Sequence, residues 1–277
     1  MTDSLKKQLL QDGFCIVENV LDRKMLDQLT RVTMQLVTAQ SSEDAAAQRS
    51  TGSMIDVFED PFFVELITYH GALEALAELG YPEPKFSGGY VISKPPHSPP
   101  LFWHHDWAAW GDPDCFGEIP QQLFLMYYLT DTFPENGCLR VIPGSHVHDN
   151  PLHVLLEEAH SRELSEARNL ENPAFSSRPD EINVQVKAGD IVIGDSRLLH
   201  ATHANDSDYQ RTVITLWYHP DMAALSESVQ GYIAGLSPRT PDHWPSAVKA
   251  LIEPLFPIYA GHRMPQPRSR KRPMRGQ

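Results

Sequence analysis

Short runs of β-branched and aromatic residues recur between Phe86 and Tyr218, and Pro, Gly, Asn and Asp separate them. The runs are GGYVISK, LFWHHDW, QLFLMYYLT, CLRVIPG, INVQV, DIVIGD and RTVITLWYH. Many short strands with turn signals between them are typical of an antiparallel sandwich or barrel, and a jelly roll is a natural way to close the sheet edges. The sequence therefore predicts a mainly β fold.

Helical periodicity flanks this β region on both sides. Before it, apolar spacing predicts helices over Ser4–Gln11, from Asp22 to about Thr38, and over Asp60–Leu79, with a polar loop at Ser41–Ser53. After it, Met222–His262 is punctuated by proline and has a helical pattern. We expect these helices to pack around the outside of the sheets.

The chain is long enough for one large core, and we predict a single catalytic domain over residues 1–262 with its barrel at about 86–220. The charged segment at about 147–180 predicts a helical insertion over one end of the barrel. Such an insertion either sets substrate specificity or is a structural flap. Residues 263–277, RMPQPRSRKRPMRGQ, are basic and nearly devoid of apolar side chains, which predicts a solvated disordered tail, with an interaction tail as the alternative.

Bulk properties exclude several classes of partner. The formal net charge of −13 disfavours a nucleic-acid partner, because phosphate binding needs a basic face. No apolar run approaches the roughly 20 residues that a bilayer crossing needs, and the N-terminus lacks the apolar region of a secretory signal. Three widely spaced cysteines indicate neither a disulfide framework nor a cysteine zinc site. We therefore expect a cytoplasmic protein with neither a nucleic-acid nor a membrane partner, and the sequence does not give its oligomeric state.

The triplet HHD contains the first candidate metal ligands. Side chains alternate faces along a strand, so His104 and Asp106 are predicted to point to one side and His105 to the other. One imidazole and one carboxylate need a third ligand, and His200, at the end of DIVIGDSRLLH, is the best candidate. Together they would form the 2-His-1-carboxylate triad that holds Fe(II) and leaves three positions open. Alone, H-x-D is a weak motif.

Arg211 strengthens the hypothesis. It lies eleven positions after His200 and opens the run RTVITLWYH. A guanidinium matches a planar carboxylate, so Arg211 is placed to hold one end of a cosubstrate whose other end chelates the metal. The cosubstrate with that chemistry is 2-oxoglutarate.

Several motifs occur together and in a fixed order. They are YVISKPPHS, HHD, NGCLRVIPGSH, AGDIVIGDSRLLH and the pattern formed by His200, Asn205, Ser207 and Arg211. In this combination the chain resembles the phytanoyl-CoA dioxygenase family over roughly residues 86–220, and QDGFCIVENVL is similar to the family's opening. The resemblance implies a double-stranded β-helix, a cupin-like jelly roll with flanking helices.

The same resemblance implies a chemistry. It implies Fe(II), 2-oxoglutarate and O2, oxidation of an unactivated C–H bond, and release of succinate and CO2. It places the iron on His104, Asp106 and His200. It places the distal carboxylate of 2-oxoglutarate on Arg211, with the Thr202 hydroxyl as a partner.

Two positions depart from the family pattern, and a third position, which follows it, is informative about the reaction. His105 stands where some relatives have a glutamine that touches the cosubstrate, and Met126 stands where some have an aromatic residue. Asp106 retains the carboxylate that halogenating relatives of this chemistry replace, which favours hydroxylation, desaturation or ring closure.

Other residues have two interpretations each. Three tryptophans either pack in the core or line a substrate box: Trp103, Trp107 and Trp110. Lys94 is either in a strand-end salt bridge or an anchor for a substrate anion. Three residues are in turn-like segments, and the two histidines among them have substrate or metal contact as the alternative: His146, Asp190 and His203.

Two other functions remain open from the residues alone. One is a Zn(II) or Mn(II) cupin hydrolase or isomerase, and the other is a non-catalytic ligand-binding protein. The segments 107–122 and 147–180, which would select a substrate, contain no informative motif.

Overall fold

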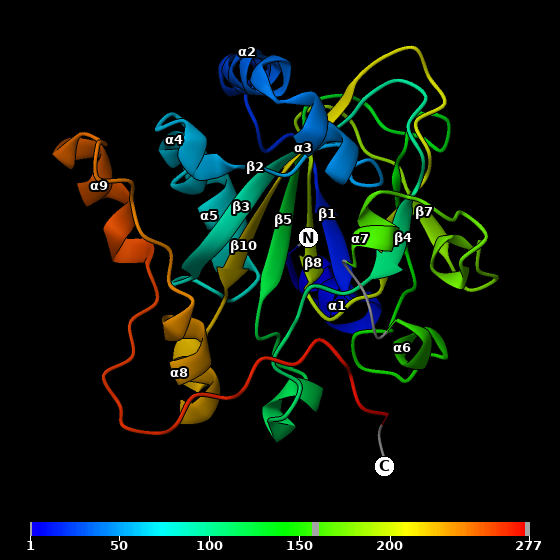
Figure 1. The fold of residues 1–277 in the computed structure, drawn as a ribbon. Helices are drawn as coiled ribbons and strands as arrows, with labels where there is room; N and C mark the ends of the chain where they lie inside the picture. Colours follow the sequence, from blue (N-terminus) through cyan, green and yellow to red (C-terminus); the bar gives the residue numbers. More distant parts are fainter. Residues whose placement is uncertain (1, 157–160, 275–277) are drawn as a thin grey trace.

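Two antiparallel sheets form the centre of the computed structural model, which describes residues 2–156 and 161–274 (Figure 1). The larger sheet has the order β1-β8-β5-β10-β3-β2, and the smaller has the order β4-β9-β6-β7. In the larger sheet the strands are β1 (Phe14–Val17), β8 (Ile191–Asp195), β5 (Leu123–Tyr128), β10 (Arg211–His219), β3 (Lys85–Lys94) and β2 (Ile55–Asp56). In the smaller sheet they are β4 (Leu101–His104), β9 (His200–Thr202), β6 (Leu139–Val141) and β7 (Ile182–Val184). The predicted jelly-roll class is confirmed.

The run QLFLMYYLT, which contains β5, is almost continuously apolar because both faces of this strand are covered. Every residue of β5 is buried. Leu125 and Tyr127 belong to the cluster beneath the outer helices, whereas Phe124, Met126 and Tyr128 belong to the cluster between the sheets. A strand covered on both faces has no polar side, and its alternate residues build two separate cores.

Helices cover the outer face of the larger sheet, as expected (Figure 1). Leu29 of α2 and Leu76 of α5 pack in the same cluster as Leu125, and Asp22 caps α2 by accepting the amide of Met25 at 2.7 Å. The helices are α1 (Thr2–Asp12), α2 (Arg23–Ala39), α3 (Ser42–Ala47), α4 (Phe63–Ile67), α5 (His70–Glu78), α6 (Leu152–Leu155), α7 (Arg162–Ser165), α8 (Glu227–Gly235) and α9 (Ser246–Ile252). The 3-10 turns are η1 (Val57–Glu59), η2 (Pro113–Phe116), η3 (Pro173–Phe175), η4 (Met222–Ala224) and η5 (Glu253–Leu255). None of the helices in the described ranges has the length and apolarity needed to cross a membrane.

Two polar segments differ from the sequence expectation. The predicted loop 41–53 contains the short helix α3, whose N-terminus is capped by Ser41. The predicted helical insertion 147–180 contains only the four-residue helices α6 and α7 and the turn η3, and residues 157–160 of it lie outside the described part. Leu152, Leu156 and Leu164 pack in the cluster around Phe102, whereas Leu155 and Leu170 are exposed, so the leucines do not form a continuous helical stripe.

The basic C-terminal segment also differs from the solvated tail expected from its composition. Within residues 263–274, Arg272 is buried, and its guanidinium forms an ion pair with Asp149 at 2.6 Å and lies over the ring of Trp110. The amide of Ser269 donates to the carbonyl of Ala108 at 2.8 Å. This segment is therefore held by polar and cation–π contacts instead of an apolar face.

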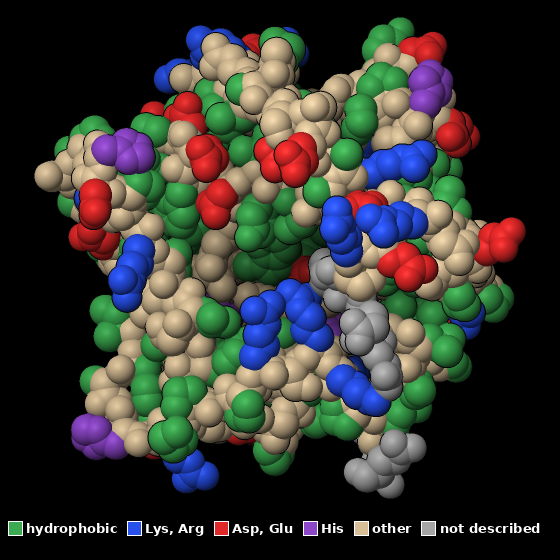
Figure 2. All heavy atoms as spheres, in the orientation of Figure 1, with side chains coloured by type: hydrophobic (Ala, Val, Ile, Leu, Met, Phe, Trp, Pro, Cys, Tyr) green, Lys and Arg blue, Asp and Glu red, His purple; other side chains and the backbone are tan. Residues whose placement is uncertain are grey.

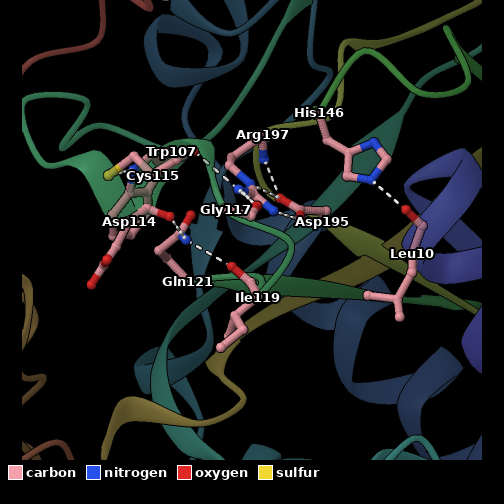
Figure 3. A network of polar contacts seen from close by, with 10 residues as sticks. All are labelled: Leu10, Trp107, Asp114, Cys115, Gly117, Ile119, Gln121, His146, Asp195 and Arg197. Atoms are coloured by element: carbon pink, nitrogen blue, oxygen red, sulfur yellow. Dashed lines mark hydrogen bonds and ion pairs between the residues drawn. The ribbon is translucent and has the colours of Figure 1, made fainter. Parts of the chain in front are cut away.

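The run DIVIGDSRLLH, expected as one strand, divides between the two sheets. Its first half is β8 in the larger sheet, and its last residue, His200, opens β9 in the smaller sheet. The connection is fixed by a buried ion pair in which Arg197 donates to both carboxylate oxygens of Asp195, at 2.6 and 2.9 Å (Figure 3).

The same guanidinium holds the loop 107–122. Arg197 donates to the carbonyls of Cys115 at 3.0 Å and Gly117 at 2.8 Å (Figure 3). Burial raises the pKa of the Asp195 carboxyl, but the charge of Arg197 and its hydrogen bonds outweigh burial and hold that pKa below its ordinary value. One arginine thus ties the sheet-to-sheet connection to the loop that follows β4.

We expect Arg197→Met to destabilise the fold by about 3 to 5 kcal/mol at pH 7, because it leaves the buried Asp195 charge without a partner. In the wild type the Asp195 carboxylate contributes its full stabilisation above the pKa that this carboxyl has in the unfolded chain. Because its pKa in the folded protein is lower, this stabilisation is lost as pH falls through the folded value. Without Arg197, burial alone would raise that pKa, so the variant would regain part of its stability from pH 7 to pH 5. Urea unfolding at both pH values measures this.

The matched control is Arg162→Met, which removes an exposed i,i+4 ion pair with Glu166. It should leave the unfolding midpoint unchanged. Equal losses in the two variants would contradict the role given to the buried pair.

Candidate metal centre

The pairing of β4 with β9 brings two histidines together. His104 and His200 are Cα partners in this antiparallel pair, and their ring centroids lie 4.1 Å apart. Both side chains are buried. The two imidazoles that the sequence places nearly a hundred positions apart thus share one site.

Asp106 completes the group, by a backbone path that differs from the predicted one. β4 ends at His104, so Asp106 does not lie in the same strand. Instead, the amides of Asp106 and Trp107 both donate to the carbonyl of Ser196, at 2.8 and 2.9 Å. This contact turns the carboxylate back toward the histidines, 3.6 Å from His104 Nε2 and 3.9 Å from His200 Nε2.

Each ligand candidate is oriented by a second contact. The Nδ1 atoms of His104 and His200 lie 3.0 Å from the carbonyls of Phe102 and Leu198, which can only accept, so Nδ1 is the donor and Nε2 keeps its lone pair. Asp106 Oδ2 accepts from the indole Nε1 of Trp217 at 2.8 Å. One potential ligand atom from each of the three residues lies within 4.8 Å of the others, which suits a divalent cation.

Arg211 lies in the same cavity as the three ligand candidates. The cavity has a volume of about 700 Å³ and is lined by His104, Asp106, His200 and Arg211. Arg211 is buried, and burial lowers the pKa of its guanidinium. Its Nε and Nη2 atoms have no hydrogen-bond partner among the described residues. A buried cation without a partner is costly, so this arrangement fits an anionic ligand.

Two hydroxyls extend this unsatisfied polar surface. Thr202 Oγ1 and Thr215 Oγ1 line the cavity and are buried without a partner in the described ranges. Thr202 follows His200 by two positions in β9, and Thr215 follows Arg211 by four in β10, so each shares a strand face with the residue before it. A ligand with carboxylate oxygens would satisfy these groups together with Arg211.

Sequence reasoning missed Trp217, although a signal for it was present. In β10, Arg211, Val213, Thr215, Trp217 and His219 all line the cavity. They are alternate residues of one strand, so the period-two rule applied from Arg211 predicts all of them. Tyr128 and Met126, on the neighbouring strand β5, line the same wall.

The tryptophans and Lys94 have mainly structural contacts. Trp103 and Trp110 pack in buried clusters, and Trp107 both packs in a cluster and lines the cavity. His105 points away from the site, with Nδ1 3.1 Å from the Trp107 carbonyl and its ring against Trp110. Lys94 fits neither predicted role, because its ammonium donates to the carbonyls of Ser50 and Pro99 at 2.6 and 2.5 Å.

The turn residues behave as expected from their segments. Asp190 accepts the amides of Asn19 and Lys187, each at 2.9 Å. His146 Nε2 lies 3.1 Å from the Leu10 carbonyl (Figure 3), and His203 Nε2 lies 2.7 Å from Asn183 Oδ1. None of the three lines the described cavity.

Comparison with known proteins agrees with this geometry. The sequence profile described as phytanoyl-CoA dioxygenase (PhyH) matches residues 9–213, which is most of the chain and includes every candidate ligand. The chain belongs to the phytanoyl-CoA dioxygenase family. Sequence motifs had suggested this family, and that prediction is confirmed.

Individual relatives of this family member are distant. An ectoine dioxygenase from Nocardia farcinica is 26% identical over 125 residues, which cover 43% of this chain and 42% of the relative. A probable phytanoyl-CoA dioxygenase from Caenorhabditis elegans is 23% identical over 222 residues, 77% of this chain and 69% of the relative. The match to the ectoine dioxygenase thus spans less than half of that protein's length.

Solved structures share the fold. The non-haem α-ketoglutarate-dependent carbocyclase SnoK from nogalamycin biosynthesis superposes with a TM-score of 0.58 at 21% identity. The superposition covers 94% of this chain and 97% of SnoK. The two-sheet arrangement of this phytanoyl-CoA dioxygenase family member is therefore one that such enzymes also have.

We expect Trp217→Phe to weaken Mn(II) or Fe(II) affinity about tenfold, because Asp106 loses the hydrogen bond that orients it while the aromatic packing remains. Anaerobic calorimetric titration of the metal-free protein measures the change. Trp244→Phe is the matched control, since Trp244 is buried away from the site and its indole nitrogen has no partner in the described ranges. Equal metal affinity in the Trp217→Phe variant and the wild type would contradict the orienting role.

Proposed function

We propose that the protein is an Fe(II)- and 2-oxoglutarate-dependent dioxygenase that oxidises an unactivated C–H bond of a small organic substrate and releases succinate and CO2. The observation that carries the proposal is the His104, Asp106 and His200 group in one cavity with a buried, unpaired Arg211. The family membership and the non-haem neighbour SnoK support the same chemistry.

The residues present fit the groups that this chemistry needs. His104, Asp106 and His200 would hold Fe(II), which keeps three coordination positions and, with 2-oxoglutarate and O2, supplies the oxidising chemistry. Arg211 would bind the distal carboxylate of 2-oxoglutarate, with the Thr202 hydroxyl as a second donor. Their unpaired buried atoms are what such a carboxylate would satisfy.

The rest of the cavity wall orients the substrate and excludes water. Trp217 keeps the Asp106 carboxylate in position. Tyr90, Trp107 and Met126 line the cavity near the candidate ligands and present apolar surface. Once a substrate fills the cavity, this apolar surface would keep water from the reacting centre and so protect it from side reactions. The protein's contribution is thus position and exclusion of solvent.

Two other functions fit the site less well. In a Zn(II) or Mn(II) cupin hydrolase or isomerase, Arg211 would remain a buried cation without an anion. A non-catalytic binding protein does not need three oriented ligands. The retained Asp106 carboxylate supports hydroxylation, desaturation or ring closure over halogenation. We also propose a small-molecule partner and a cytoplasmic location, which the three buried free cysteines support.

We expect succinate formation from 2-oxoglutarate to require added Fe(II) and to be abolished by Asp106→Ala, because the remaining histidines cannot hold the metal. Succinate is quantified by chromatography after incubation in air with a panel of metabolites. Circular dichroism of the variant checks that the fold is intact. A wild-type protein that binds metal yet is indifferent to 2-oxoglutarate would overturn the proposed function in favour of another metal-dependent activity.

We expect Arg211→Met to raise the dissociation constant for 2-oxoglutarate about 100-fold, the loss typical of a charge-assisted contact, while metal affinity is unchanged. Thr202→Val should raise it by less, because a neutral hydroxyl contributes less than a guanidinium. Anaerobic titration of the Fe(II)-loaded protein, followed by its visible absorption, measures both. Unchanged 2-oxoglutarate binding in Arg211→Met would refute this assignment.

A further inference from the structure

The C-terminal arm, residues 263–274, crosses the molecule beside the cavity (Figure 1). Three kinds of contact hold it. The Gln266 amide donates to the Ser228 carbonyl of α8 at 2.9 Å, and Ser269 forms a parallel bridge with Ala109. Arg272 is buried between Asp149 and the ring of Trp110. The arm is therefore anchored on both sides of residue 270.

Between these anchors the arm presents two arginines to the cavity. Arg268 and Arg270 both line it, and Arg239 lines it from the segment after α8. Figure 2 shows Lys and Arg side chains gathered along one lip of the central hollow, whose interior is apolar. Arg270 is partly buried, and no ion pair or hydrogen bond joins Arg268 or Arg270 to another side chain in the described part of the chain. The carboxylate with an electrostatic effect on Arg270 is that of Asp106, a candidate metal ligand, so in the described ranges neither arginine has an ion-pair partner of its own.

The charge of the cavity is opposite to that of the protein. The chain has a formal net charge of −13, yet its cavity is lined by four arginines and two aspartates. The four arginines are Arg211, Arg239, Arg268 and Arg270, and the aspartates are Asp56 and Asp106. Cations concentrated in a concave site with low-dielectric walls attract an anionic ligand. Arg211 is the deep member and is assigned to the cosubstrate, so the mouth arginines remain for a second anion.

We propose that the C-terminal arm forms an anion subsite of the substrate pocket, in which Arg268 and Arg270 bind a carboxylate or phosphate group of the substrate. This inference rests on the proposed function for the metal end of the same cavity. The aromatic residues Tyr90, Trp107 and Tyr232 lie in the cavity lining, so the substrate class is an organic anion with an apolar body. Its charged group lies at the mouth, and the bond to be oxidised points toward the candidate metal.

The test uses three small probes that share a phenyl group: benzoate, phenyl phosphate and benzyl alcohol. Each is titrated calorimetrically into the full chain loaded with Zn(II) and saturated with 2-oxoglutarate, so that Arg211 is occupied. We expect both anions to bind and benzyl alcohol not to bind measurably. The ratio of the affinities for benzoate and phenyl phosphate distinguishes a carboxylate subsite from a phosphate subsite.

The deciding variant is Arg268→Gln/Arg270→Gln, in which both anions should bind at least about tenfold more weakly. Arg31→Gln/Arg263→Gln is the matched control, because it removes the same charge from two exposed arginines that do not line the cavity. The control should bind both anions within twofold of the wild type. The affinity for 2-oxoglutarate should be unchanged in both double variants.

Three outcomes would overturn the subsite: no anion binding to the wild type, equal binding of benzyl alcohol, or equal weakening in the control. Repeating the titrations in an Arg211→Met background without 2-oxoglutarate separates the two proposals. If 2-oxoglutarate does not bind to the wild type but the anions still depend on Arg268 and Arg270 in the Arg211→Met background, the subsite stands and the proposed function fails. If 2-oxoglutarate binds to the wild type and the anion affinities do not depend on these arginines, the subsite alone fails.

Discussion

The alignment of His104 opposite His200 in the β4–β9 pair is the constraint on which the candidate metal centre depends. The connection from β8 to β9 has two roles at this site. Ser196 accepts the amide of Asp106 and so turns the carboxylate toward the imidazoles, and its two neighbours, Asp195 and Arg197, form the buried ion pair. The connection 196–199 thus positions two of the three candidate ligands, because the Ser196 carbonyl holds Asp106 and the Leu198 carbonyl orients His200. This explains why a buried charge pair lies so close to the site.

Strand β10 connects the candidate metal to the candidate cosubstrate site. Arg211, Thr215 and Trp217 project from one face of it, and Trp217 in turn holds Asp106. Because these residues share a face, the spacing between the guanidinium and the ligand carboxylate is fixed by strand geometry and by pairing with both β3 and β5. A one-residue slip would turn all of them out of the cavity.

Electrostatics divide the cavity into two ends. At the deep end the candidate metal site shares the cavity with the buried Arg211, and at the mouth the C-terminal arm supplies Arg268 and Arg270. Gathering four arginines in this cavity is electrostatically unfavourable in the absence of anions, since like charges repel when they are brought together. Two anions, a cosubstrate and a substrate, would remove that repulsion at both ends.

The sequence by itself determined the β-rich class and the family, and it predicted the four residues His104, Asp106, His200 and Arg211, because strand-like runs and motif order are local properties of the chain. It did not determine that β4 ends before Asp106, since that turn is set by the Ser196 carbonyl, ninety positions downstream, which accepts the Asp106 amide. The period-two rule, applied from Arg211, also predicts that Trp217 faces the cavity, whereas nothing in the local sequence indicates its hydrogen bond to Asp106.

Only the tertiary structure decided the place of the arm. Its composition lacks the apolar residues that order a segment, so sequence predicts a solvated end. In the fold, Arg272 instead meets Asp149 and the face of Trp110, partners more than a hundred positions away. Contacts at such separation depend on how the whole chain is folded, and local composition contains no information about them.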